Sequence, residues 1–131
     1  MRHEPVFLTL AETIEVHEYQ IEHFGGTDGL RSLELLKSAV GMPSSTFNGN
    51  YLHPTIPDMA AAYLFLLVKN HPFVDGNKRV GTMSALVFLE LNGYGFDASD
   101  DGLTDAVLQV ASGEMTKESL SQFFRLHSHC N

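Results

Sequence analysis

In the N-terminal third of the chain, hydrophobic residues recur every three or four positions, the spacing of helices that bury one face. Thr9 and Glu12 precede the first run in the pattern of a capping box, and Gly25 ends it. A second run follows Asp28 and ends at Gly41. The two apolar faces would consist of Leu10, Ile14, His17, Ile21 and Phe24, and of Leu30, Leu33, Leu36 and Val40. Two core helices are therefore predicted here.

Two longer apolar runs lie in the middle of the chain, separated by a short polar segment. The run from Asp58 to Asn70 is apolar all round, which is typical of a central buried helix. Pro72 ends this helix, because the residue before a proline is pushed out of the helical region. The next helix is predicted from about Gly76 to Asn92, with Gly93 as its stop. Two buried helices should thus flank the polar segment.

The segment 43–57, between the second and third predicted helices, is rich in Ser, Thr, Asn, Gly and Pro. Within it, Asn48-Gly49 separates two short β-prone pieces that end at Phe47 and begin at Asn50. Asn-Gly at such a place is a strong hairpin signal, because both residues tolerate positive φ. The segment predicts a small hairpin or flap, with a plain surface loop as the alternative.

Two shorter helical runs complete the chain, one closed by Gly113 and the other capped by Thr116. Their apolar positions are Leu103, Val107 and Val110 in the first and Leu120, Phe123 and Phe124 in the second. No internal repeat or domain boundary interrupts the pattern. The sequence therefore predicts an all-α fold, a compact bundle of about six helices with a small β-hairpin flap, in a single domain over residues 1–131.

The composition of the chain mainly excludes certain classes of protein. At 131 residues, of which 44% are hydrophobic and 18% charged, the chain is long enough to bury one core. Eight Lys and Arg against sixteen Asp and Glu give a formal charge of −8, so we expect a protein partner and no direct nucleic-acid binding. The alternative is that the acidity only confers solubility. No apolar run reaches membrane-spanning length, and the single cysteine, Cys130, cannot form an internal disulfide. We therefore expect a soluble, cytoplasmic protein that does not bind membranes.

The segment His71-Pro-Phe-Val-Asp-Gly-Asn-Lys-Arg79 concentrates polar groups at the turn between the central helices. The first backbone N–H groups of a helix lack internal partners and lie at the positive end of its dipole, so phosphate is a natural ligand there. Gly76 would let a phosphate approach the backbone. Asn77 can donate an amide N–H, and Arg79 can offer a planar fork to phosphate oxygens. The segment predicts a site for the phosphate chain of a ligand.

Two residues of this segment are candidates for chemistry. His71 stands on the turn and titrates near neutrality, so we expect it to act as the general base that removes a proton from an attacking hydroxyl. Asp75 offers a hard oxygen ligand that suits a Mg²⁺ ion bridging phosphates. A satisfied turn histidine is the alternative for His71, and a solvated helix face is the alternative for Lys78. Phe73 should lie in the core and anchor the turn.

The C-terminal residues His127, His129 and Cys130 form a second group with metal-ligand chemistry. Because no clear fourth ligand accompanies them, both a zinc site and a frayed terminal tail remain open.

At the central segment the chain resembles the Fic/Doc family, whose motif reads His-Pro-Phe-x-Asp/Glu-Gly-Asn-Gly/Lys-Arg. Every position is met, and the resemblance extends from the flap near Thr46 to Asn92. It implies a compact helical core with a β-flap that aligns a segment of a target protein by strand addition. The residues expected to bind the target on this flap are Phe47, Asn48 and Tyr51.

The resemblance also implies an activity. Most members of the family have glycine at the position of Lys78 and transfer AMP from ATP to a protein hydroxyl. Lysine there resembles the Doc branch, toxins of toxin–antitoxin pairs that phosphorylate a threonine of elongation factor Tu. The Doc branch has alanine in place of Gly76, so AMP transfer stays the alternative. A non-catalytic helical interaction module is the remaining one.

The roles implied by the resemblance fall on a short set of residues. His71, Asp75 and Arg79 would be catalytic, and Asp75 would hold the metal. ATP would be bound by Lys69, Gly76, Asn77, Lys78 and Arg79. Lys69 enters this set because it occupies a place where the Doc branch carries an arginine.

A separate inhibitor is the last implication of the resemblance. Family members that restrain themselves carry a Ser/Thr-x-x-x-Glu-Gly/Asn segment, whose glutamate pairs with a phosphate-binding arginine of the site. No Ser or Thr of this sequence is followed four residues later by Glu. The resemblance therefore implies a cognate antitoxin that acts in trans and reaches Arg79 or Lys78.

Overall fold

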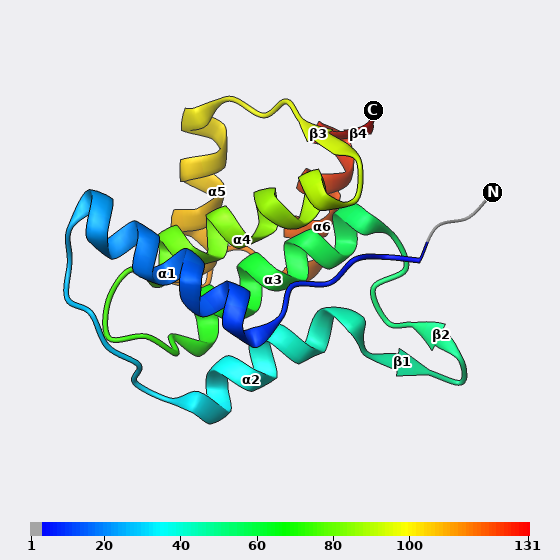
Figure 1. The fold of residues 1–131 in the computed structure, drawn as a ribbon. Helices are drawn as coiled ribbons and strands as arrows, with labels where there is room; N and C mark the ends of the chain where they lie inside the picture. Colours follow the sequence, from blue (N-terminus) through cyan, green and yellow to red (C-terminus); the bar gives the residue numbers. More distant parts are fainter. Residues whose placement is uncertain (1–3) are drawn as a thin grey trace.

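Two helices form the centre of the fold: α3 (Ile56–Asn70) and α4 (Asn77–Leu91). The computed structural model describes residues 4–131. In Figure 1, α3 and α4 run side by side through the middle of the molecule, and they pack against each other along their length. The predicted central buried helix is confirmed, because most of the side chains of α3 are buried.

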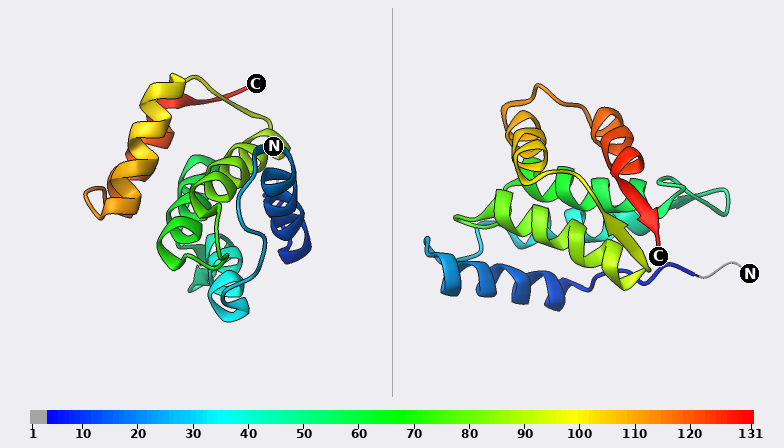
Figure 2. Two further views of the ribbon diagram at one scale, coloured as in Figure 1. Left: turned by 90° about the vertical axis from the view of Figure 1, so that its left-hand side faces the viewer. Right: turned by 90° about the horizontal axis from the view of Figure 1, so that it is seen from above.

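The other helices surround this pair on two sides. They are α1 (Leu10–Phe24), α2 (Leu33–Gly41), α5 (Asp100–Ser112) and α6 (Lys117–His127). Figure 2 shows α5 and α6 together on one side of the central pair, with α1 and α2 on the other. The prediction of a compact, mostly helical fold of about six helices is confirmed for the residues that the structure describes.

Side-chain caps decide where several helices begin. Thr9 and Glu12 form the predicted capping box at the start of α1, each side chain bonded to the backbone N–H of the other. The Thr55 hydroxyl accepts a hydrogen bond from the N–H of Asp58, so α3 begins at Ile56 rather than at the predicted Asp58. The two predicted caps of the last helices are confirmed: Gly113 ends α5, and Thr116 caps the start of α6.

The second helix begins later than its apolar spacing suggested. Leu30 was predicted on its buried face, yet it lies before the helix and forms an isolated antiparallel bridge with Phe73. The Ser32 hydroxyl accepts a hydrogen bond from the N–H of Leu35 and so caps α2 at Leu33. A side-chain cap and a long-range backbone pairing thus override the local periodicity.

The predicted hairpin is confirmed. Strands β1 (Thr46–Phe47) and β2 (Asn50–Tyr51) pair antiparallel, after a short 3₁₀ helix, η1 (Met42–Ser44). Asn48 and Gly49 at its tip have φ values of 52° and 79°. These left-handed conformations are those that Asn and Gly tolerate best, so the turn follows directly from the sequence.

A second small sheet was not predicted. Strand β3 (Tyr94–Phe96) pairs antiparallel with β4 (Ser128–Cys130), and the N–H of Asn131 donates to the carbonyl of Gly93. The alternative of a frayed C-terminal tail is therefore wrong. Each strand has three residues and its partner lies far along the chain, so neither carries a local signal strong enough for prediction.

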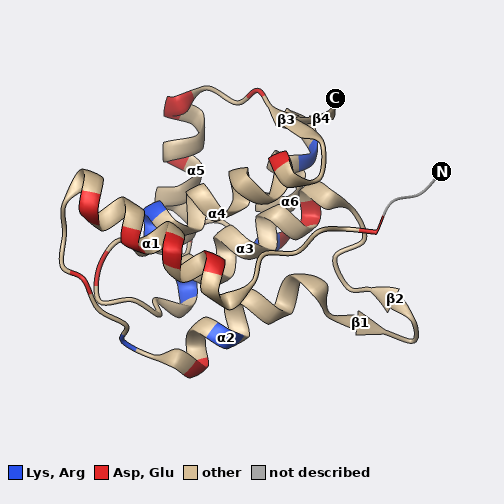
Figure 3. Cartoon of the chain, in the orientation of Figure 1, with Lys and Arg blue, Asp and Glu red and all other residues tan. Residues whose placement is uncertain are grey.

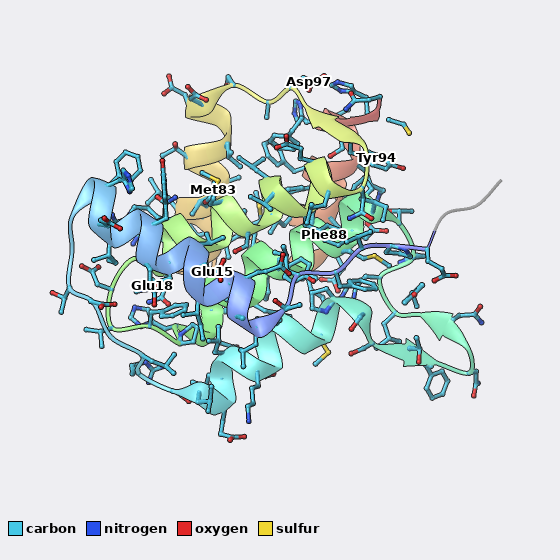
Figure 4. All side chains as sticks on the ribbon, viewed as in Figure 1. Glu15, Glu18, Met83, Phe88, Tyr94 and Asp97 are labelled. Carbon is cyan, nitrogen blue, oxygen red and sulfur yellow. The ribbon has the colours of Figure 1, made fainter. Side chains whose placement is uncertain are left out.

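The core continues from α3 and α4 into the flanking helices. Its largest buried side chains include Tyr63, Phe88 and Phe124, and Figure 4 shows Phe88 on the inner side of α4. The Tyr63 hydroxyl accepts a 3.0 Å hydrogen bond from the N–H of Leu8, and burial raises the pKa of Tyr63 to about 12. Among the residues described, no helix is both long and apolar enough to cross a membrane.

Candidate functional site

The polar segment forms the turn between α3 and α4, as predicted. His71 caps the end of α3 in the left-handed conformation, with φ 50°, and Gly76 caps the start of α4 with φ 80°. Left-handed backbone at a helix end is typical of glycine and uncommon for histidine. The chain thus reverses direction within a few residues and brings the ends of both central helices together.

Phe73 and Asn77 lock the interior of this turn. The amide of Asn77 donates to the carbonyl of Phe73 over 2.9 Å and accepts from its N–H over 3.0 Å. Both residues are buried, so the expectation that Phe73 anchors the turn is confirmed. The side chain of Asn77 therefore serves the turn in this structure, and its contact with a phosphate stays a prediction.

His17 of α1 is a part of the site that the sequence placed only as a core position. Its ring is 1% exposed and stacks on Phe73 with centroids 3.8 Å apart and planes 6° apart. Its Nε2 lies 2.7 Å from the backbone carbonyl of Asp75 and donates to it, since a carbonyl oxygen can only accept. The only local signal was a polar ring on an apolar helix face.

The carboxylate of Asp75 is held by backbone donors on both oxygens. Oδ2 accepts from the N–H of Thr27 over 3.1 Å, and Oδ1 accepts from the N–H of Gly76 over 2.8 Å. These two bonds, with Arg79 and Lys78 nearby, hold the pKa of Asp75 below its usual range. Asp75 is therefore an ionised, exposed carboxylate at neutral pH, with a lone pair left on each oxygen.

The two cations of the motif, Arg79 and Lys78, lie near enough to this carboxylate to lower its pKa. Arg79 donates from Nη1 to the carbonyl of Gly25 over 2.8 Å and more weakly to that of Gln20 over 3.4 Å. The C-terminal end of α1 thus holds one of the two terminal nitrogens of the guanidinium. Lys78 is exposed in the first turn of α4. Other N–H groups of Arg79 remain for a ligand.

A cavity of about 200 Å³ collects most of the predicted site residues. It is lined by Val68, His71, Asp75, Gly76, Asn77, Lys78, Arg79 and Ala111. A neighbouring cavity of about 420 Å³ between α1, α4 and α5 shares Lys78 and Arg79 with it. The exposed imidazole of His71 has no hydrogen-bond partner among the described residues, so it is available to a ligand.

Two sets of predicted residues lie outside this cavity. The ammonium of Lys69 lies beside Gly113 at the end of α5, and Lys69 does not line the cavity. The hairpin with Phe47, Asn48 and Tyr51 lies at the N-terminal end of α3, whose 15 residues span roughly 22 Å. Their roles in binding phosphate and target stay predictions.

The C-terminal histidines contact Asp97 rather than each other. His127 Nδ1 lies 2.9 Å from Oδ1 of Asp97, and His129 Nδ1 lies 3.8 Å from Oδ2. The described residues contain no cluster of three or more His, Cys, Asp or Glu side chains that could hold a metal ion. Nothing in this part of the chain therefore supports the zinc alternative.

Acidic residues dominate the outer face of α1. Figure 3 shows them spaced along this helix, and Glu15 and Glu18 are exposed (Figure 4). This distribution accords with the formal charge of −8. The outer face of α1 is therefore a surface that attracts basic groups.

Known proteins resemble this chain over most of its length. A family model described as the Fic/DOC family matches residues 7–89. A protein named Toxin Doc from Mycolicibacterium smegmatis is 37% identical over 100 residues, covering 75% of this chain and 77% of the relative. A protein named Protein kinase doc from Escherichia phage P1 is 30% identical over 129 residues, covering 95% of this chain and 94% of the relative.

The family match is wider than the motif and flap suggested. The sequence indicated a resemblance from Thr46 onward, whereas the match begins at residue 7 and so includes α1 and α2. α1 supplies His17, and the segment after it supplies Gly25 and Thr27, which bind Arg79 and Asp75. Since the match covers more than half of the chain and both relatives are Doc proteins, this chain belongs to the Fic/Doc family, in its Doc branch.

Proposed function

We propose that this protein is a Doc-type toxin that transfers the γ-phosphoryl group of ATP to a Ser or Thr hydroxyl of a target protein. The observation that carries the proposal is the convergence of His71, Asp75, Lys78 and Arg79 on one cavity at the start of α4. A base, a carboxylate and two cations are the groups that phosphoryl transfer requires. The relative from phage P1, named a protein kinase, supports the same reaction.

His71 is the proposed general base. Its imidazole lines the cavity and has no hydrogen-bond partner among the described residues, so it can accept a proton. In the proposed step, the target's hydroxyl oxygen forms a bond to the γ-phosphorus, and the bond from that phosphorus to the β–γ bridging oxygen breaks. The hydroxyl proton moves to His71, and ADP leaves with the electron pair of the broken bond.

Asp75 fits the requirements of a Mg²⁺ ligand. It is exposed, its pKa is lowered by backbone hydrogen bonds, and its oxygens are hard donors. Since Mg²⁺ is commonly held by one or two carboxylates together with substrate phosphates, one carboxylate is sufficient here. The ion, bound with the nucleotide, would neutralise phosphate charge. The chain's own contribution is to keep Asp75 ionised and oriented through Thr27 and Gly76.

Lys78 is the residue that favours the γ-phosphoryl group over AMP. Its long cationic side chain lies at the mouth of α4, where glycine would leave room for the inner phosphates of an AMP donor. Because the Lys78 side chain occupies this space, the terminal phosphate of ATP should face His71. AMP transfer remains the second candidate because Gly76, with its φ of 80°, keeps the backbone open to phosphate.

ATP labelled at one phosphate distinguishes the two reactions. The purified protein is incubated with a bacterial extract and Mg²⁺, using ATP labelled at the γ-phosphate or at the α-phosphate. We expect protein-bound label only from the γ position. Label retained from the α position would replace the kinase by an AMP transferase and leave the site assignment in place. No protein-bound label from either would contradict the proposed function.

The proposed function also implies two protein partners. The target would be a translation factor, with elongation factor Tu as the first candidate, and its modification would arrest translation in the cytoplasm. The proposed antitoxin is a separate chain whose acidic group reaches Arg79 or Lys78, and the relative named Toxin Doc supports this pairing. Both cations line the cavity and are accessible to such a group.

A further inference from the structure

One arginine outside the motif binds three successive backbone carbonyls of the turn between α3 and α4. Arg31 donates from Nη2 to the carbonyl of Asn70 over 2.8 Å and from Nε to that of His71 over 2.6 Å. Its own backbone N–H donates to the carbonyl of Pro72 over 2.7 Å. The three carbonyls surround the backbone of His71, so Arg31 contacts the turn where the proposed base is attached.

The backbone of His71 needs such support. A left-handed φ of 50° is uncommon for a residue with a side chain, and a residue before proline prefers extended backbone. The last carbonyls of α3 also lack partners within the helix, and they form the negative end of its dipole. A planar guanidinium supplies two donors in fixed geometry and a positive charge at this position. Arg31 therefore meets both needs together.

Backbone pairing around Arg31 is independent of its side chain. The N–H of Ser32 donates to the carbonyl of Pro72, and the N–H of Val74 donates to the carbonyl of Gly29, each over 2.9 Å. These bonds dock the segment before α2 onto the turn without the guanidinium. Truncation of Arg31 should thus remove two side-chain bonds and leave this docking in place.

We propose that Arg31 is a positioning residue that holds His71 in its left-handed conformation and so aims the imidazole at the reacting hydroxyl. Arg31 is not among the residues that line the motif cavity, so it acts through His71 rather than on the nucleotide. This inference rests on the proposed role of His71 as the base. It holds equally for phosphoryl and AMP transfer, because both need a proton acceptor at the same place.

Kinetics of Arg31→Ala test the inference. We expect kcat for transfer to fall about 10- to 100-fold, the effect of a small misplacement of a catalytic group, while KM for ATP changes little. In the His71→Ala background, Arg31→Ala should cause no further loss. Arg31→Lys should be intermediate, because one ammonium cannot reproduce the two-pronged fork. Lys37→Met, which removes an exposed cation on α2, is the matched control and should match wild type.

Independent losses in the double variant would overturn the inference, because Arg31 would then not act through His71. So would an unchanged kcat in folded Arg31→Ala. A raised KM for ATP with unchanged kcat would assign Arg31 to nucleotide binding instead and would equally overturn it.

A measurement without turnover separates this inference from the proposed function. In NMR spectra of the nucleotide-free protein, the Cα and Cβ shifts of His71 and its amide-to-α-proton coupling report its φ. We expect Arg31→Ala to move them toward extended values while the rest of the spectrum stays folded. Unchanged values would overturn the inference even if transfer activity were never detected. Absent activity with moved values would instead contradict only the proposed function.

Discussion

His17 illustrates how a single buried polar ring supports the site. Its Nε2–H satisfies the carbonyl of Asp75 while its face packs on Phe73, so one side chain fixes both the backbone and the anchor of the turn. Arg31 performs a comparable task at the start of the turn, where it binds the carbonyls of Asn70 and His71. The motif thus depends on residues that the motif itself does not contain.

Replacement of His17 by phenylalanine tests this support. The ring and its stacking remain, but the carbonyl of Asp75 loses its donor, so we expect the free energy of unfolding to drop by about 1–3 kcal/mol. Transfer should also slow, because Asp75 moves. The matched control is His23→Phe, on the exposed face of the same helix, which should cost far less. Equal stability of the two variants in urea denaturation would contradict the assignment.

Residues with local signals were predictable, and residues with distant partners were not. The motif could be predicted because its polar residues are concentrated between two apolar runs. The capping box could be predicted from the spacing of Thr9 and Glu12. The bonds made by His17 and Arg31 join positions far apart in the chain, so no local pattern contains them. The left-handed φ of His71 likewise required the structure.

At the scale of elements, the same division holds. Helices and the β1–β2 hairpin follow from caps, periodicity and an Asn-Gly turn, which are local. The β3–β4 pairing joins the end of the chain to the residues after α4, and the late start of α2 depends on the Leu30–Phe73 bridge. Prediction failed for the β3–β4 pairing, which is a tertiary contact, and for the starts of α2 and α3, where the Ser32 and Thr55 caps also set the boundary.

The connection from β2 to α3 is tied to α6 through a buried histidine. His53 is 6% exposed, and its Nε2 lies 3.1 Å from Nζ of Lys117, so a neutral imidazole accepts from the ammonium. Burial lowers the pKa of His53 from its usual 6.5, and Lys117 adds to this effect while Asp58 opposes it. His53 therefore stays neutral in the fold at a pH where an unfolded chain would protonate it.

This difference predicts a pH dependence of stability. As pH falls through about 6.5, the unfolded state takes up a proton that the native state refuses, so stability is lost on acidification and is complete above that pH. In His53→Gln, the slope of unfolding free energy against pH between about 7 and 5 should be smaller than in wild type. Urea denaturation at a series of pH values measures both slopes. Identical slopes would show that His53 does not contribute.

At the scale of the whole molecule, the helical bundle brings the end of α3 and the start of α4 to one cavity. α1 and the segment before α2 support them there. The central pair supplies His71 from the end of α3 and Asp75, Lys78 and Arg79 around the start of α4. α1 holds Asp75 and Arg79, and the segment before α2 holds the backbone of His71. α1 and the segment before α2 thus determine the geometry of the site.

His71 is the proposed base of a γ-phosphoryl transfer to protein. The most direct test compares wild type with His71→Ala, using ATP labelled at the γ-phosphate and the modified target as the readout. Because His71 is exposed, the variant should fold and keep wild-type stability, and its rate should fall roughly 10²–10⁴-fold. Transfer at the wild-type rate by a folded His71→Ala protein would contradict the account.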